Sequence, residues 1–365
     1  MKTSAKIIIG ALVILAIALV LVLQFSHLEG FAVHNTKKTV KVGIILPLTG
    51  SNALIGEGMR DAVLLAQENY KNTKYNYKII LEDDQLDPAQ TATAANKLIG
   101  ADQVNAIISV SSSPGNVVSP IAQQNKVLHI SLASDANIAK GSYNFIDWTQ
   151  PQEENRVFIQ ELQKREIKSV AVIRQNHPGA AAIVNNMKEQ ATEKGITIYE
   201  EMFNAGDKDF KTIIMKEKEK NPDIYFIIAY SPELEIIAKQ IQELGITKPM
   251  TSIEAFDVTS QPELFEGMWY ITAAEPNSEF RNAFKAKYKI DQTYGSANAY
   301  DAYNLIVAAF EASSKPNATE AADSLRNIRN FPGALGILNV DSKNIIQSKA
   351  VVKEIVNKTF VTISN

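Results

Sequence analysis

The sequence contains no cysteine, which excludes disulfides, thiolate metal sites, cysteine nucleophiles and a lipid anchor on an acylated cysteine. It also lacks a Gly-x-x-x-x-Gly-Lys-Ser/Thr phosphate loop, a Gly-x-Ser-x-Gly nucleophile elbow and a His-Glu-x-x-His zinc helix. The four histidines are scattered along the chain, and no nucleophile is placed beside a base. We therefore expect neither an enzyme nor a protein that carries a cofactor or a metal.

An excess of positive charge is also absent, because 37 Lys and Arg residues face 40 Asp and Glu residues and give a formal net charge of −3. Binding to nucleic acid through phosphate neutralisation needs a concentrated basic face, so we expect no nucleic-acid partner. The hydrophobic share of 45% and the length of 365 residues are typical of a globular protein with two domains of ordinary size.

The N-terminus carries the only long hydrophobic run, an uncharged segment of 17 residues from Ile7 to Leu23 that follows Lys2 and Lys6. As a helix it spans roughly 25 Å, slightly less than a bilayer core but more than a usual signal-peptide core. A retained anchor and a cleaved signal peptide both fit. The small residues 30–32 lie far from the apolar run, which favours the anchor. In both cases the chain after Leu23 is expected outside the cytoplasm.

Strand and helix patterns alternate along most of the remaining sequence. Short β-branched runs such as 106–110 are apolar throughout, which is typical of parallel strands covered on both faces. Repeated strand-helix units on both sides of about residue 149 predict an α/β protein with two doubly wound lobes. Three final strands are expected at 334–340, 349–355 and 360–363.

Two neighbouring strands in the stretch 106–135 end in loops rich in hydroxyl groups. The first loop contains Ser111, Ser112 and Ser113 before Pro114, and the second contains Ala133, Ser134 and Asp135. The carboxyl ends of parallel strands meet at one sheet edge, where helix N-termini and hydroxyls collect ligands. These loops predict a site for a small polar or anionic group.

Two polar residues occupy equivalent places in the second half of the chain. Tyr230 follows the strand 224–229, and Glu254 follows the strand 250–253. Either residue alone is more often an ordinary loop residue. Their position at strand ends, facing the serine loops of the other lobe, favours a shared cleft.

Three further motifs have simple structural interpretations. Gly56-Glu57-Gly58 lacks the third glycine of a dinucleotide loop, so we interpret it as close packing of a loop against a helix. Asp83 and Asp84 are adjacent at a strand end and point in different directions, which favours capping or solvation over a metal pair. His129 lies within a buried strand and is expected to be a hydrogen-bonded core imidazole.

Short motifs follow one another in a fixed order from about residue 41 to the C-terminus: Val42–Gly50, Glu82–Asp84 with Asp87-Pro88, Ser111–Ser113, Ala205–Phe210, Tyr230–Glu233 and Ile337–Asp341. This ordered set resembles the leucine/isoleucine/valine-binding protein family, the type I periplasmic substrate-binding proteins of ABC transporters. The resemblance implies a monomer that delivers a small solute to an ABC permease.

The family fold implies two Rossmann-like lobes joined by a three-crossing hinge, with a solute held between them. The crossings are expected near Trp148, Ala274 and Gly336. The implied domains are an N-terminal segment 1–39, a first lobe of 40–148 plus 275–336, and a second lobe of 149–274 plus 337–365.

The resemblance also implies roles for individual residues. Ser112 matches a serine that holds the ligand carboxylate, and the carbonyl of Ala133 matches an acceptor for the ligand ammonium. Tyr230 matches the family tyrosine, and Glu254 matches the acidic residue that pairs with the ammonium. The expected ligand-binding set is Ser112, Ser113, Ala133, Ser134, Asp135, Tyr230 and Glu254.

Asp135 departs from the amino-acid binders, because it stands where they carry threonine. Ile55 and Pro178 also depart, since they stand where those proteins often carry aromatic residues. A carboxylate about 4 Å from a ligand carboxylate would cost about 4 kcal/mol at an effective dielectric constant of 20. Either Ser134 takes the role of the threonine, or the ligand has no carboxylate there. A branched-chain or related amino acid is the expected ligand. An amide, urea-like or cationic solute, or a ligand-sensing receptor ectodomain, is the alternative.

Overall fold

The structure is a computed structural model that describes residues 37–364, so the predicted N-terminal anchor or signal segment lies outside the described residues. No helix within residues 37–364 is long and apolar enough to cross a membrane. From Thr39 onward the chain forms a six-stranded sheet, a four-stranded sheet, a three-stranded sheet and a two-stranded hairpin.

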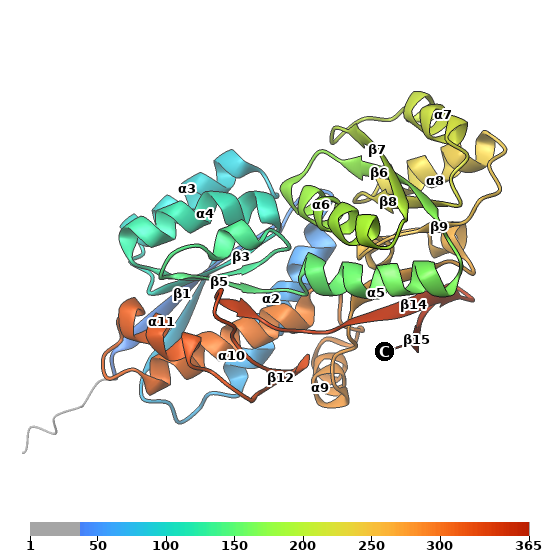
Figure 1. Cartoon of the computed structure of the whole chain (residues 1–365). Coiled ribbons are helices and arrows are strands. Elements are labelled where there is room, and N and C mark those ends of the chain that lie inside the picture. The colour runs from blue at the N-terminus through green and yellow to red at the C-terminus, as the bar shows by residue number, and fades with distance from the viewer. Residues whose placement is uncertain (1–36, 365) are drawn as a thin grey trace, which may run out of the picture. The chain divides into compact units, whose positions relative to one another are not determined.

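The six-stranded sheet is parallel throughout and has the order β13-β5-β4-β3-β1-β2. Helices α3 and α4 cover one face, and α2, α10 and α11 cover the other (Figure 1). Successive side chains of a strand point to opposite faces of the sheet. Ile44 packs against α2, α10 and α11, whereas Ile45 packs against α3 and α4. The elements are β1 (Thr39–Leu46), α2 (Ala53–Glu68), β2 (Asn76–Asp83), α3 (Pro88–Gly100), β3 (Ala106–Val110), α4 (Ser112–Asn125), β4 (Leu128–Leu132), a 3-10 helix η1 (Ala136–Ala139), β5 (Asn144–Asp147), α10 (Ser296–Ala312), α11 (Ala318–Arg326) and β13 (Ile345–Ile346).

The four-stranded sheet is also parallel and has the order β7-β6-β8-β9. Val172 faces a core shared with α5 and α6, whereas Ile173 faces a core shared with α7 and α8. The elements are α5 (Pro151–Lys164), β6 (Ser169–Gln175), α6 (Pro178–Glu193), β7 (Thr197–Phe203), α7 (Lys211–Glu219), β8 (Ile224–Ile228), α8 (Glu233–Glu243), β9 (Met250–Thr251) and the 3-10 helices η2 (Ala255–Val258) and η3 (Pro262–Phe265).

Three chain segments connect the two parallel sheets and lie side by side. The Thr149 hydroxyl is 2.8 Å from that of Ser348, and the backbone N–H of Ala274 donates to the Lys349 carbonyl at 2.9 Å. The third segment therefore lies later than the expected position near Gly336. The remaining elements are β10 (Trp269–Ala273), α9 (Ser278–Tyr288), β11 (Phe331–Gly333), β12 (Gly336–Leu338), β14 (Ala350–Val356) and β15 (Thr359–Ser364).

The prediction of one strand at 334–340 is wrong, because the chain turns there into the hairpin of β11 and β12 and then enters β13. The carboxylate of Asp301 accepts the N–H groups of Ala334 and Leu335 at 2.6 and 3.0 Å, and Gly336 follows with a φ of 101°. These bonds fix the turn, and no local sequence pattern indicates a partner on α10. The alternation of strands and helices expected before residue 330 is present, and the last two expected strands correspond to β14 and β15.

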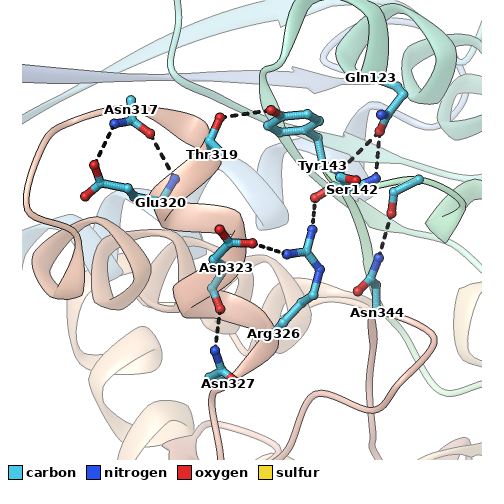
Figure 2. Close-up of polar contacts among 11 residues, drawn as sticks. Gln123, Ser142, Tyr143, Asn317, Thr319, Glu320, Asp323, Arg326, Asn327 and Asn344 are labelled. Carbon is cyan, nitrogen blue, oxygen red and sulfur yellow. Dashed lines mark hydrogen bonds and ion pairs between the residues drawn. The ribbon is translucent and has the colours of Figure 1, made fainter.

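The turn before β5 is held by polar contacts from several elements (Figure 2). The side-chain oxygen of Gln123 on α4 accepts the N–H groups of Ser142 and Tyr143, and the Tyr143 hydroxyl bonds Thr319 on α11 at 2.9 Å. Asn344 donates to the Gly141 carbonyl at 3.0 Å. These contacts fix the start of β5, which leads directly to the first connection between the sheets.

The structural interpretations of the three isolated motifs are confirmed. A β-carbon on Gly56 would lie 2.0 Å from the carbonyl oxygen of Pro47, so the loop and the helix do approach closely. Asp83 accepts the N–H of Leu48 at 2.8 Å and thereby holds the loop after β1. His129 is fully buried between Ser109 and Asn144, its neighbours at 2.8 and 2.9 Å, and burial lowers its pKa to about 4.

Gly56 and Gly100 provide a matched pair for testing this packing. Gly56→Ala is expected to destabilise the protein by about 1–3 kcal/mol, because its methyl group meets backbone. Gly100→Ala is expected to be neutral or to stabilise by about 0.4–1 kcal/mol, because nothing lies within 4 Å of an added β-carbon. Urea unfolding measures both. Equal effects would contradict the close approach at Gly56.

Candidate ligand-binding site

A cavity of about 80 Å³ lies where the carboxyl ends of β3 and β4 face those of β6 and β8. Among the residues expected to bind ligand, those that line it are Ser112, Ala133, Ser134, Tyr230 and Glu254. Ser113 and Asp135 do not line it. The cavity therefore joins strand ends of both parallel sheets in one place.

The first wall of the cavity is the N-terminus of α4. Ser111 takes a φ of 73° directly before the helix, and Ser112 begins the helix and is 2% exposed. The oxygen of the Ser112 hydroxyl accepts the N–H of Asp135 at 3.2 Å, so the hydroxyl proton can be donated into the cavity. The first N–H groups of a helix have no partner within it. This edge is therefore suited to a carboxylate or another small anion.

Asp135 places its carboxylate on a second polar cleft instead of in the cavity. The carboxylate caps η1 by accepting the N–H of Asn137 at 3.0 Å, and it also accepts the side-chain amide of Asn116 at 2.9 Å. Ser134, one residue earlier, lines the cavity. The carboxylate of Asp135 is thus used for structure and leaves the anion-binding edge uncharged.

The opposite wall carries Glu254, which follows β9 with a φ of 63°. The indole N–H of Trp148 donates to its carboxylate. Burial raises the pKa of Glu254, and hydrogen bonding to its neighbours opposes that rise. A carboxylate that lines a cavity and accepts a hydrogen bond there is a site for a cationic group.

His177 and Ser111 make a contact between the two walls. The Ser111 hydroxyl is 3.2 Å from Nε2 of His177, and Nδ1 accepts the N–H of Gly179 at 3.1 Å. Because Nδ1 is an acceptor, Nε2 carries the proton and donates to Ser111. Burial lowers the pKa of His177 to about 4. A β-carbon on Gly179 would be 2.9 Å from the Ser112 hydroxyl, so the walls are in close contact.

An apolar surface completes the cavity between its two polar ends. It consists of aliphatic and methionine side chains from α2, α6, η2, the loop after β2 and several strand ends: Ile55, Met59, Leu86, Val110, Leu132, Ile183, Ile228, Ile253 and Val258. Such a surface stabilises an apolar group of a ligand by removing it from water.

Several cavity residues were absent from the expected set. Trp148 was expected only as a hinge residue, and its place directly after β5 is a signal that could have identified it. Tyr294 lies in an irregular segment before α10, and Ser111 and His177 complete the contact between the walls. Tyr294 belongs to no motif and no strand end, so the sequence carries no signal for it.

The comparisons with known proteins agree with this architecture. The model of the periplasmic binding protein family matches residues 39–352, and the chain belongs to this family. A leucine-, isoleucine-, valine-, threonine- and alanine-binding protein from Pseudomonas aeruginosa is 25% identical over 343 residues, which cover 88% of this chain and 91% of that protein.

Solved structures share the fold. The leucine-binding protein LivK from Thermotoga maritima has a TM-score of 0.83 and 26% identity, and the match covers 89% of this chain and 98% of that one. LivJ from Streptococcus pneumoniae, solved with isoleucine, has a TM-score of 0.80 and 23% identity, with 90% and 100% covered. The predicted fold, two Rossmann-like lobes of the type I class, is confirmed.

Family membership establishes the general activity. Proteins of this family bind small solutes outside the cytoplasm and work with the permeases of ABC transporters. The chain is therefore an extracytoplasmic solute-binding protein, as the sequence predicts.

The two tryptophans offer a direct test of the cavity. Trp148 lines it, whereas Trp269 is 5% exposed and packs against Phe158 with 5.6 Å between ring centroids. Solute binding is expected to change the intrinsic fluorescence of Trp148 alone. Trp148→Phe should abolish the change at saturating solute, and Trp269→Phe should preserve it. A full signal from Trp148→Phe would place the solute elsewhere.

Proposed function

We propose that the protein binds a branched-chain or related amino acid and delivers it to an ABC permease. The observation that carries the proposal is the order in which anion-binding, apolar and acidic groups follow one another along the cavity. An anion-binding helix start, an apolar surface and a carboxylate correspond to the three parts of an α-amino acid.

The two charged ends of the amino acid then have separate partners. Its carboxylate accepts from the Ser112 hydroxyl and the first N–H groups of α4, with Ser134 beside them. Its ammonium donates to Glu254 and to the carbonyl of Ala133, and Tyr230 encloses it from the second wall. Charge-assisted bonds of this kind are worth about 1.5–3 kcal/mol each.

The position of Asp135 supports an amino acid over an amide, urea-like or cationic solute. A second carboxylate inside the cavity would favour a ligand without negative charge. Asp135 instead bonds Asn116 and Asn137 outside the cavity lining, so a ligand carboxylate meets no like charge there. The names of the relatives, which include leucine, isoleucine and valine binders, support the same solute class.

The proposal includes three further points: the protein does no covalent chemistry, acts as a monomer and is held at the membrane by the segment before residue 40. The Ser111–His177 pair supports the first, because Nε2 of His177 already carries a proton and cannot accept one from Ser111. The apolar run Ile7–Leu23 supports the membrane anchor.

Calorimetry against a panel of amino acids tests the solute class. Wild-type protein is expected to bind leucine, isoleucine or valine. Glu254→Gln should weaken that binding by about ten- to a hundredfold, because the ammonium loses its charged acceptor. Glu219→Gln, at an exposed position on α7, is the matched control and should leave affinity unchanged. No binding of any panel member, or equal affinity in Glu254→Gln, would contradict the proposal.

A pH dependence of affinity follows from His177. In the closed cavity its pKa is about 4 because of burial, with Asp135, Ser111 and Tyr230 as its neighbours. Opening exposes the ring to water and returns its pKa toward about 6.5. The open state therefore binds more protons between these values, and closure weakens as the pH falls.

Affinity for the amino acid is accordingly expected to be constant above about pH 6.5 and to decline as the pH falls toward 4. His177→Asn should reduce the change of affinity with pH, because asparagine does not titrate. The asparagine side chain can still cap α6, so the helix start is kept. Calorimetric titrations between pH 4.5 and 8 measure the slope. An unchanged slope in His177→Asn would assign the proton to another group.

A further inference from the structure

Glu254 has an unfavourable backbone conformation. Its φ of 63° lies in the left-handed region, which a residue with a β-carbon rarely adopts and which persists only where surrounding contacts hold it. The N–H of Glu254 donates to the carbonyl of Ile271 on β10 at 2.7 Å, and its carbonyl accepts the N–H of Asp257 at 3.0 Å. The contacts at both ends of the turn from Glu254 to Asp257 therefore decide where the carboxylate of Glu254 lies.

The side chain of Asp257 attaches the far end of this turn to the same strand. Its carboxylate accepts the hydroxyl of Tyr270 at 2.6 Å and also the hydroxyl of Thr272. These two residues flank Ile271 and share one face of the strand, because side chains alternate along a strand. The turn is thus bound to three consecutive residues of β10, through the backbone at Glu254 and through a carboxylate at Asp257.

Lys353 on β14 completes this attachment. It stands directly opposite Tyr270 in the pairing of β14 with β10, and its ammonium lies 3.5 Å from the carboxylate of Asp257. The side chains of Lys353 and Asp257 are only 12% and 13% exposed, so solvent ions screen this pair weakly. Lys353 also pairs with Glu275 at 2.8 Å and would keep that partner without Asp257. Three donors therefore fix the orientation of the Asp257 carboxylate.

We propose that Asp257 is a positioning residue that holds Glu254 in the conformation that directs its carboxylate to Trp148 and the cavity. Asp257 does not line the ligand cavity, so it acts on the solute through Glu254. This inference rests on the proposed function, in which Glu254 accepts the ammonium, and it identifies the residue that keeps this acceptor in place.

The test compares two substitutions of Asp257. Asp257→Ala removes every acceptor, whereas Asp257→Asn keeps an acceptor for one hydroxyl and can donate its amide to the oxygen of the other. A further variant, Tyr270→Phe with Thr272→Val, removes the two hydroxyls and keeps the charges of Asp257 and Lys353. Glu263→Ala, at an exposed position on η3, is the control. Calorimetry measures all of these proteins with leucine, isoleucine and valine.

Asp257→Ala is expected to lose about ten- to a hundredfold in affinity, because Glu254 no longer stays at the ammonium. The variant without the two hydroxyls should lose about tenfold. Asp257→Asn and Glu263→Ala are expected to bind within about threefold of wild type. Wild-type affinity in Asp257→Ala would overturn the inference. An equal loss in Asp257→Asn and Asp257→Ala would also overturn it, since the charge alone would then be responsible.

Nuclear magnetic resonance gives a readout that needs no ligand. The chain has two tryptophans, so a nitrogen–proton spectrum contains two indole resonances, and Trp148→Phe identifies that of Trp148. Because this indole donates to Glu254, displacement of Glu254 should move its resonance toward the position found in Glu254→Ala. This shift is expected in Asp257→Ala and in the variant without the two hydroxyls, and not in Asp257→Asn or Glu263→Ala.

An unmoved Trp148 resonance in both of the variants expected to shift it would overturn the inference, and the variant without the hydroxyls keeps the test open if Asp257→Ala does not fold. If the resonance moves but wild type binds no amino acid, the proposed function fails and the positioning of Glu254 by Asp257 stands.

Discussion

A carboxylate placed inside a protein is stable only if donors surround it, and Glu254 imposes this requirement on the second wall of the cavity. Trp148, which donates to Glu254, comes from the first connection between the sheets. Tyr294, from the segment before α10, and Glu154, from α5, lie close enough for the charge of Glu254 to raise their pKa values. Distant parts of the chain thus meet at one charge. The position of the connecting segments and the chemistry of the binding site are consequently fixed by the same contacts.

The anion-binding wall is built by a different physical principle, since it uses no charged side chain. The start of α4 supplies backbone N–H groups, and the Ser112 hydroxyl is oriented by the backbone of Asp135. The Asp135 carboxylate caps η1 and is directed to other partners. One end of the cavity therefore depends on backbone direction and the other on side-chain groups, so substitutions at the two ends are expected to act through different mechanisms.

Much of the fold follows from the sequence, because buried parallel strands are uniformly apolar and their ends carry recognisable loops. Ser112, Tyr230 and Glu254 could be placed at one cleft for that reason. Tyr294 could not, since it follows no strand, and the hairpin after residue 330 depends on Asp301, a partner some thirty positions earlier. The direction of the Asp135 side chain was equally hidden, because it is set by Asn116 and Asn137 and not by its place in the loop.

The three segments between the sheets also determine how the molecule can be divided. The second lobe takes β14 and β15 from the end of the chain, while β13, only a few residues earlier, belongs to the first sheet. Neither half is encoded by one uninterrupted stretch, so no single cut yields an independently folding fragment. Synthesis must reach β13 before the first sheet can be completed, and it must reach β14 and β15 before the second half can be.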